Sequence, residues 1–138
     1  MSNQIVENEK SSSVMLGKSP DDLHRLFEQG LNSGDLYALV ALYAFDGVLM
    51  AGSGLAEGIS AIRQVLADYI AMKPNIELRT RRVVAAGDTA LLVADWRFRG
   101  TTCEGGNVLT SGTSIEVARR QPDGSWRYYI DLPYGLGE

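Results

Sequence analysis

The sequence is poor in residues that form disulfides or bind soft metals, with one cysteine and one histidine among 138 residues. Cys103 cannot close an internal disulfide, and with only His24 to accompany it, a structural zinc site is excluded. Cys103 precedes Glu104 and has no basic neighbour in the sequence, so nothing nearby favours a reactive thiolate. We expect no metal, no nucleophilic role for Cys103 and no cofactor.

The sequence also lacks a surplus of positive charge, with 13 Lys and Arg against 17 Asp and Glu and a net charge of −4. No segment collects a long basic run, so nucleic acid is not the expected partner. A possible basic stripe on two adjacent predicted strands consists of five arginines: Arg79, Arg81, Arg82, Arg97 and Arg99. Asp95 lies among them, which favours a solvated ladder of ion pairs. Anion binding through this stripe is the alternative, and it predicts salt-dependent binding to polynucleotides.

Long apolar runs and phosphate-binding loops are missing as well. No stretch approaches the ~20 apolar residues that span a bilayer, so no membrane partner is expected. The glycine-rich segment Gly100 to Gly106 joins two predicted strands and precedes no helix, which argues against a nucleotide cofactor. Residues 1–19 are polar and lack the basic start and apolar stretch of a secretory signal, which predicts a flexible tail on a cytoplasmic protein.

The hydrophobic content, 45% of the residues, is sufficient to form the core of one domain. Ser19-Pro20-Asp21-Asp22 is typical of a helix start, and Asn32-Ser33-Gly34 of a helix end. Asp35 can cap a second helix carrying Leu36 to Tyr43, followed by Asp46-Gly47 and a short strand from Val48 to Met50. A glycine-rich connection from Gly52 to Gly58 comes next.

The second half of the chain changes its hydrophobic period from helix to strand. A third, amphipathic helix is expected from Ile59 to the stop at Lys73-Pro74. Four long strands follow, joined by short connections that imply antiparallel neighbours: Glu77 to Ala86, Thr89 to Arg99, Val108 to Arg120 and Ser125 to Leu132. The order favours an α+β domain over residues 20–135, with 136–138 as a C-terminal tail.

Three segments in this order carry a resemblance to a known superfamily. They are the helix junction Leu31-Asn32-Ser33-Gly34-Asp35-Leu36 running into Ala41 to Val48, the segment Glu57 to Arg63, and the segment Arg120 to Arg127 followed by Asp131. Together they resemble the nuclear transport factor 2-like superfamily, which includes ketosteroid isomerases and SnoaL-like polyketide cyclases. The resemblance implies a cystatin-like cone of three helices on a strongly curved, mainly antiparallel sheet, enclosing a small-molecule pocket. It does not choose among the superfamily's enzymes, ligand binders and assembly modules.

The resemblance also implies which catalytic groups are missing. The ketosteroid isomerase tyrosine in the first helix corresponds to Phe27, which has no hydroxyl, and the aspartate base corresponds to Ala51. Glu116 falls near the second acid, where burial would make it a neutral donor, although a surface ion pair is equally compatible with the sequence. Classical steroid isomerisation is therefore not expected.

The last two strands give conflicting indications about which face is inside. If Glu116 lies opposite Tyr129, then Ser114 lies opposite Asp131, and these four share one surface. The other surface is apolar: Ile115, Val117, Trp126, Tyr128, Ile130 and Leu132. Alternation alone would bury the apolar surface, whereas the family resemblance points Asp131 into the cone. A homodimer that covers an outward apolar sheet face reconciles the two.

On this interpretation the pocket is mainly apolar, with Asp131 and Glu116 as candidate catalytic groups. The remaining candidate ligand-binding residues are Phe27, Tyr43, Met50, Trp96, Phe98, Ser114 and Tyr129, with Leu92 and Ala94 in the same wall. A purely structural role for each is the alternative, with Asp131 accepting hydrogen bonds and the aromatic residues packing the interior. His24, next to acidic residues in the first helical turn, is expected to be solvated or capping.

Two functions follow from these residues. One is cofactor-free acid–base chemistry, of isomerase, cyclase or hydrolase type, on a small apolar or aromatic oxygenated molecule. The alternative is a domain that binds a ligand or dimerises without catalysis.

Overall fold

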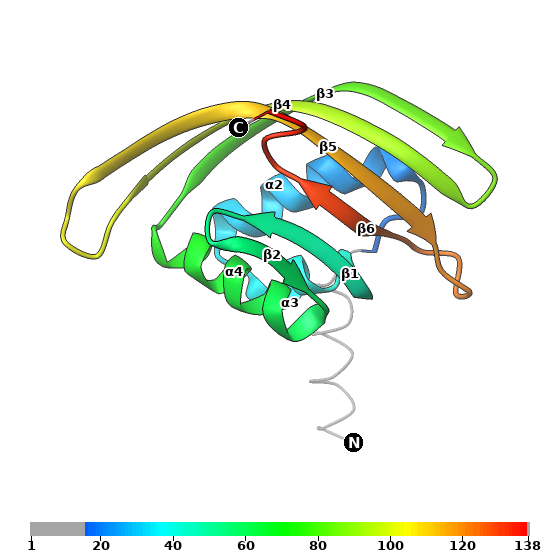
Figure 1. The fold of residues 1–138 in the computed structure, drawn as a ribbon, viewed down its shortest axis with the longest axis horizontal. Coiled ribbons are helices and arrows are strands. Elements are labelled where there is room, and N and C mark those ends of the chain that lie inside the picture. Colours follow the sequence, from blue (N-terminus) through cyan, green and yellow to red (C-terminus); the bar gives the residue numbers. More distant parts are fainter. Residues whose placement is uncertain (1–15, 138) are drawn as a thin grey trace.

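The computed structural model describes residues 16–137, so most of the predicted N-terminal tail and the last residue lie outside the described part. A 3₁₀ turn, Pro20–Asp22 (η1), leads into α2 (Leu23–Ser33), and the other helices are α3 (Leu36–Val40) and α4 (Ile59–Ala71). All three α-helices lie on one side of a curved sheet (Figure 1). The α+β prediction is confirmed.

The predicted ends of the first helix are also confirmed. Pro20 occupies the first helical position, where its missing N–H costs no hydrogen bond, and the Ser19 amide donates to Asp22 Oδ2 at 3.3 Å. Gly34 ends the helix in the left-handed conformation with φ of 71°. Asp35 then caps α3, since its carboxylate accepts a hydrogen bond from the Ala38 amide at 3.1 Å.

The second predicted helix is too long. It ends at Val40, and Tyr43 begins strand β1 (Tyr43–Ala51), which turns back into the unpredicted strand β2 (Gly54–Glu57). The reason is tertiary: β1 lies parallel to the last strand, and the Tyr128 amide donates to the Leu42 carbonyl at 2.7 Å. Gly47 permits this close approach, because a Cβ there would lie 3.0 Å from the Tyr129 carbonyl oxygen.

Six strands form one sheet in the order β2-β1-β6-β5-β4-β3. The four long predicted strands are present as β3 (Asn75–Ala86), β4 (Thr89–Thr101), β5 (Asn107–Arg120) and β6 (Trp126–Leu132). All neighbours are antiparallel except β1 and β6. The sheet is open, and Figure 1 shows β3, β4 and β5 arching over α2.

A β-bulge at Tyr129 resolves the conflict over the last two strands. Val117 pairs with Ile130 but Ala118 pairs with Tyr128, so β6 holds one extra residue at this point. The side chains before the bulge therefore change face relative to those after it. Trp126 and Tyr128 are buried at 7% and 2% exposure on the same side as Asp131.

This register corrects the sequence-based pairing. Glu116 lies opposite Asp131, not opposite Tyr129, and Ser114 has no partner in β6. The prediction that Trp126 and Tyr128 face outward was wrong, because it assumed that side chains alternate between the two faces without interruption along β6. Glu116 and Asp131 nevertheless share the inner face, as expected.

The core between sheet and helices is aliphatic. Fully buried leucines and an isoleucine from five elements meet there: Leu23, Leu31, Leu39, Leu49, Ile62, Leu66 and Leu92. None of the helices in residues 16–137 has the length and apolarity to cross a bilayer.

Candidate functional site

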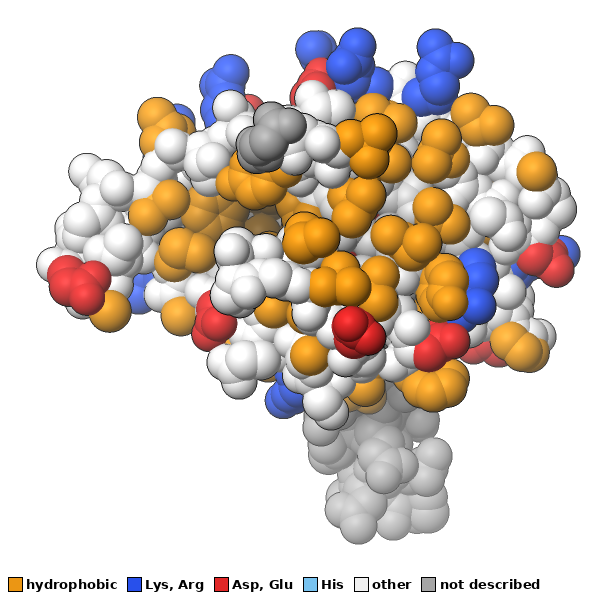
Figure 2. All heavy atoms as spheres, in the orientation of Figure 1, with side chains coloured by type: hydrophobic (Ala, Val, Ile, Leu, Met, Phe, Trp, Pro, Cys, Tyr) orange, Lys and Arg blue, Asp and Glu red, His pale blue; other side chains and the backbone are white. Residues whose placement is uncertain are grey.

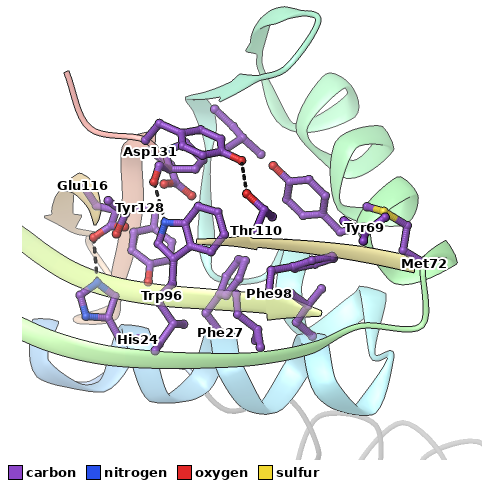
Figure 3. Close-up of a pocket in the computed structure, with 18 residues that line it drawn as sticks. His24, Phe27, Tyr69, Met72, Trp96, Phe98, Thr110, Glu116, Tyr128 and Asp131 are labelled. Atoms are coloured by element: carbon purple, nitrogen blue, oxygen red, sulfur yellow. Dashed lines mark hydrogen bonds and ion pairs between the residues drawn. The ribbon is translucent and has the colours of Figure 1, made fainter. Parts of the chain in front are cut away.

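A cavity of about 290 Å³ opens between the concave face of the sheet and helices α2 and α4. Its wall is mostly apolar, and Figure 2 shows hydrophobic side chains around a hollow near the C-terminus. Six aromatic side chains contribute to the wall: Phe27, Tyr69, Trp96, Phe98, Tyr128 and Tyr134. Figure 3 places His24, Glu116 and Asp131 at one end and Tyr69 and Met72 at the other.

Trp96 and the segment after β6 fix the shape of the cavity. The Trp96 indole Nε1–H donates to the Pro133 carbonyl at 2.7 Å, and the ring packs edge-on against Tyr134 with centroids 5.2 Å apart. Gly112, directly opposite Trp96 in β5, leaves the space for both rings, because a Cβ there would lie 3.0 Å from Trp96 Cζ2. The Thr110 and Tyr134 hydroxyls are hydrogen-bonded at 3.3 Å.

Asp131 is the buried carboxyl at the polar end, with 6% exposure. The Tyr43 hydroxyl donates to its Oδ2 at 2.5 Å. Burial first and the charge of Glu116 second raise the pKa of Asp131 from 3.8 to about 8, and the Tyr43 hydrogen bond opposes both. Asp131 is therefore mostly protonated at neutral pH and can donate a hydrogen bond or a proton.

Burial and the nearby carboxyl groups also raise the pKa of three tyrosine hydroxyls. Burial, then the charge of Asp131, raises the pKa of Tyr43 and of Tyr69 well above the ordinary value. For Tyr128, burial comes first and the charges of Glu116 and Asp131 follow, again raising the pKa. These three hydroxyls remain neutral at physiological pH and act only as hydrogen-bonding groups.

Glu116 lies beside Asp131 on the neighbouring strand and has a different partner. His24 Nε2 is 2.7 Å from Glu116 Oε1, and the side chains are 4% and 5% exposed. The other ring nitrogen, Nδ1, is 2.7 Å from the Thr80 hydroxyl on β3. The expectation of a solvated His24 was wrong: the ring is buried and spans the distance from helix α2 to two strands.

The helix period explains why His24 faces the cavity. His24, Phe27 and Leu31 recur at positions i, i+3 and i+7 of α2, and all three contribute to the cavity wall. The acidic neighbours Asp21 and Asp22 belong to the 3₁₀ turn before the helix, where the Asp22 carboxylate accepts from the Ser19 amide and from Arg25. The sequence did contain this signal, in the spacing to Phe27 and Leu31.

Most of the candidate residues predicted from the sequence reach this cavity. Phe27, Trp96, Phe98, Ser114, Glu116 and Asp131 all contribute to its wall. Tyr43 lies behind the wall, fully buried, and reaches the site only through its hydrogen bond to Asp131. Leu92 and Ala94 are buried in the core beneath.

Two candidates lie elsewhere. Met50 is 44% exposed near the end of β1 and does not contribute to the cavity wall, because the strand carries its neighbour Leu49 inward instead. The Tyr129 ring, displaced to the outer face by the bulge, lies under the Arg119 guanidinium at 3.6 Å from the ring centroid. Because of the bulge, Tyr128 contributes to the cavity wall and Tyr129 does not.

Several wall residues were not predicted. Tyr69 and Met72 come from the end of α4, while Pro133 and Tyr134 follow β6. Tyr69 did appear in the apolar pattern of its helix, but nothing local distinguishes a residue facing a cavity from one in a solid core. Within residues 16–137, no three His, Cys, Asp or Glu side chains gather as a metal site would require.

The fold recurs in solved structures with low sequence identity. A ketosteroid isomerase-like protein from Erwinia carotovora atroseptica superposes with a TM-score of 0.74 at 20% identity, over 86% of this chain and 94% of that one. A nuclear transport factor 2-like protein from Salmonella enterica serovar Typhimurium has a TM-score of 0.74 at 17% identity, over 85% and 88% of the two chains. A protein with a cystatin-like fold from Novosphingobium aromaticivorans gives 0.67 at 23% identity, over 80% and 75%.

These likenesses establish the nuclear transport factor 2-like fold and no activity, since all are below 25% identity. No functionally curated protein matches the sequence. The model of the SnoaL-like domain matches residues 23–129, which include every strand except the end of β6 and every α-helix. The chain therefore belongs to the SnoaL-like domain family.

Proposed function

We propose that this protein catalyses cofactor-free proton transfer on a small, apolar, oxygenated molecule bound in the cavity. The observation that carries the proposal is the pair of buried carboxyl groups, Glu116 and Asp131, side by side at the polar end of an otherwise apolar cavity. Burial raises the pKa of Asp131 to about 8, a value suited to acid–base catalysis at neutral pH.

Asp131 supplies the acid. With a pKa of about 8, the protonated form exceeds the ionised form by about tenfold at pH 7. It donates a hydrogen bond to a carbonyl oxygen of the substrate and stabilises the negative charge that grows there when a neighbouring C–H loses its proton. Tyr43, bonded to the other side of the carboxyl, holds it in place.

Glu116 supplies the base. Its carboxylate, hydrogen-bonded to His24, lies on the same inner face as Asp131, so both reach one bound molecule. The aromatic wall holds the apolar body of the substrate and excludes water from the carboxyl pair. The sequence resemblance implies that Phe27 and Ala51 correspond to the tyrosine and aspartate of ketosteroid isomerases, so the proposal uses a different pair of groups and not the classical arrangement.

The test is catalysed hydrogen–deuterium exchange at the α-carbon of a model ketone. We propose 2-tetralone, an apolar bicyclic ketone, in D₂O, followed by ¹H NMR. The wild type should accelerate exchange over buffer, and Asp131→Asn and Glu116→Gln should each lose about 10²-fold or more of that acceleration. Tyr129→Phe, on the outer face, is the matched control and should exchange at the wild-type rate. Equal rates in buffer and wild type would remove the catalytic proposal.

A ligand-binding protein without catalysis is the second candidate. It is favoured by the sequence resemblance, which implies that Phe27 and Ala51 replace the isomerase tyrosine and aspartate. It predicts that 2-tetralone perturbs the NMR signals of cavity residues without any exchange, and that Asp131→Asn binds it unchanged. The two functions therefore differ in the same experiment.

We also propose a homodimer formed through the outer face of the sheet. Six apolar side chains lie there in two rows across three strands: Leu91, Val117 and Ile130 in one row, and Val93, Ile115 and Leu132 in the other. Figure 2 shows hydrophobic side chains gathered over β5 and β6. Such a contiguous apolar patch is typical of an association surface.

A further inference from the structure

The two carboxyl groups of the site differ in the kind of group that holds them. Asp131 is held by the phenol of Tyr43, which donates at 2.5 Å and stays neutral. Glu116 is held by an imidazole at 2.7 Å, which can carry a positive charge. The strand register places these carboxyls directly opposite each other, so the charge of one acts on the other.

The contacts of His24 fix which ring nitrogen faces Glu116. Thr80 lies at an exposed position of β3, and its hydroxyl can either donate to Nδ1 of the neutral ring or accept from Nδ1–H of the charged ring. With either role of Thr80, Nε2–H can donate to the Glu116 carboxylate.

Other charged groups do not compete for this role. The wall of the cavity, as described for residues 16–137, contains no lysine or arginine. The titratable groups beside the carboxyl pair are the phenols of Tyr43 of β1 and Tyr128 of β6, both neutral at pH 7, while Tyr69 of α4, also neutral, lies at the other end of the cavity. His24 is therefore the one basic side chain that the described part of the wall offers Glu116.

We propose that His24 is the positioning residue that makes Glu116 the proton acceptor and leaves the proton on Asp131. With Glu116 ionised beside it, Asp131 loses its own proton less readily, since two adjacent carboxylates in an apolar site repel each other. Without His24, the shared proton would be distributed over both carboxyls and the acid and base would no longer be distinct. This inference rests on the proposed function, which gives the two roles their meaning.

The test uses the free protein and NMR, so it needs no substrate. His24 is the only histidine in the chain, and its ring signals are therefore unambiguous. Long-range ¹H–¹⁵N spectra of the wild type should show Nε2 protonated at pH 7. A spectrum with Nε2 unprotonated would overturn the proposal, whatever the behaviour of any variant.

The variants separate the role of the ring from its volume. In His24→Phe, which keeps a ring but loses the donor, the titration midpoint of the Asp131 carboxyl carbon should fall by about one pH unit or more. In His24→Gln, whose amide can still donate to Glu116, the midpoint should stay closer to the wild-type value. An unchanged Asp131 midpoint in His24→Phe would overturn the proposal. If that variant fails to fold, the protonation of Nε2 in the wild-type spectrum decides the proposal.

These results are distinguishable from a failure of the proposed function. Absence of 2-tetralone exchange, with the NMR shifts as expected, would remove catalysis and keep the placement of the proton. Exchange by the wild type with an unchanged Asp131 midpoint in His24→Phe would keep catalysis and remove the role of His24.

Discussion

Glu116 and Asp131 face each other across β5 and β6, one bonded to the imidazole of His24 and the other to the phenol of Tyr43. Two acids on one face of a sheet, held by partners of different basicity, are a common way of obtaining a donor and an acceptor at the same pH. The contacts lead to predictions for the pH dependence of stability, for the shape of the cavity and for association.

The stability of the protein should fall as the pH rises from about 4 to about 8. In this range the unfolded Asp131 has lost its proton while the folded one keeps it, since the pKa is raised from 3.8 to about 8. The folded state then binds more protons, so the free energy of unfolding decreases by about 1.4 kcal/mol per pH unit from this group. Asp131→Asn removes that slope, and urea unfolding at several pH values measures it.

The control for this slope is Glu57→Gln, which removes an exposed carboxyl from the edge strand β2. Its free energy of unfolding should follow the wild type across the pH range. If Asp131→Asn and the wild type show the same pH dependence, Asp131 has no raised pKa in the folded state.

Tyr43→Phe should raise the pKa of Asp131 above the wild-type value. The Tyr43 hydroxyl donates to the carboxylate and so favours its ionised form, and this hydrogen bond is the one contribution that lowers the pKa. The variant should also lose about 1 kcal/mol of stability, because a buried hydrogen bond is removed without changing the ring. Carboxyl ¹³C titration and thermal unfolding measure the two effects, and a lower pKa in the variant would contradict the assigned hydrogen bond.

Gly112→Ala should distort the cavity near Trp96. The new methyl group would lie 3.0 Å from Trp96 Cζ2 and 3.2 Å from Tyr134 Cδ1, so at least one ring has to move. We expect a loss of about 1 to 3 kcal/mol of stability and a change in tryptophan fluorescence. Gly52→Ala is the control, because a Cβ at Gly52 meets nothing within 4 Å. Equal effects of the two substitutions would argue against the tight contact.

Val117→Lys should convert the proposed dimer to a monomer. The charge would fall within the apolar rows on the outer face, between Leu91 and Ile130. Light scattering coupled to size-exclusion chromatography measures the mass. Leu109→Lys, at a position already 71% exposed and outside those rows, should leave the mass unchanged. A wild type that is monomeric at the highest concentrations tested would remove the dimer.

Much of the fold could be predicted from local patterns. The ends of α2 and α4 and the four long strands carry their own signals, in capping residues, helical spacing and turn residues. Tyr43 was misassigned because apolar spacing extends the helix through it, whereas parallel pairing with Tyr128 makes it a strand. That pairing depends on a distant segment, which no local pattern reports.

The site was predictable in part. Asp131 and Glu116 were found through the family resemblance and alternation. The bulge at Tyr129 has no local signal in the sequence, so Tyr129 was predicted to face the cavity and Tyr128 to face outward, the reverse of their positions in the structure. His24 was missed because its acidic neighbours suggested solvent, although its spacing to Phe27 and Leu31 placed it on the buried face.

The central claim is that Asp131 carries a proton at neutral pH beside an ionised Glu116. The most direct measurement is the pH titration of the Asp131 carboxyl carbon by ¹³C NMR in the wild-type protein. The structure predicts a midpoint near the pKa of about 8. A midpoint near 4, the ordinary value of an aspartate, would contradict it and leave the cavity without its acid.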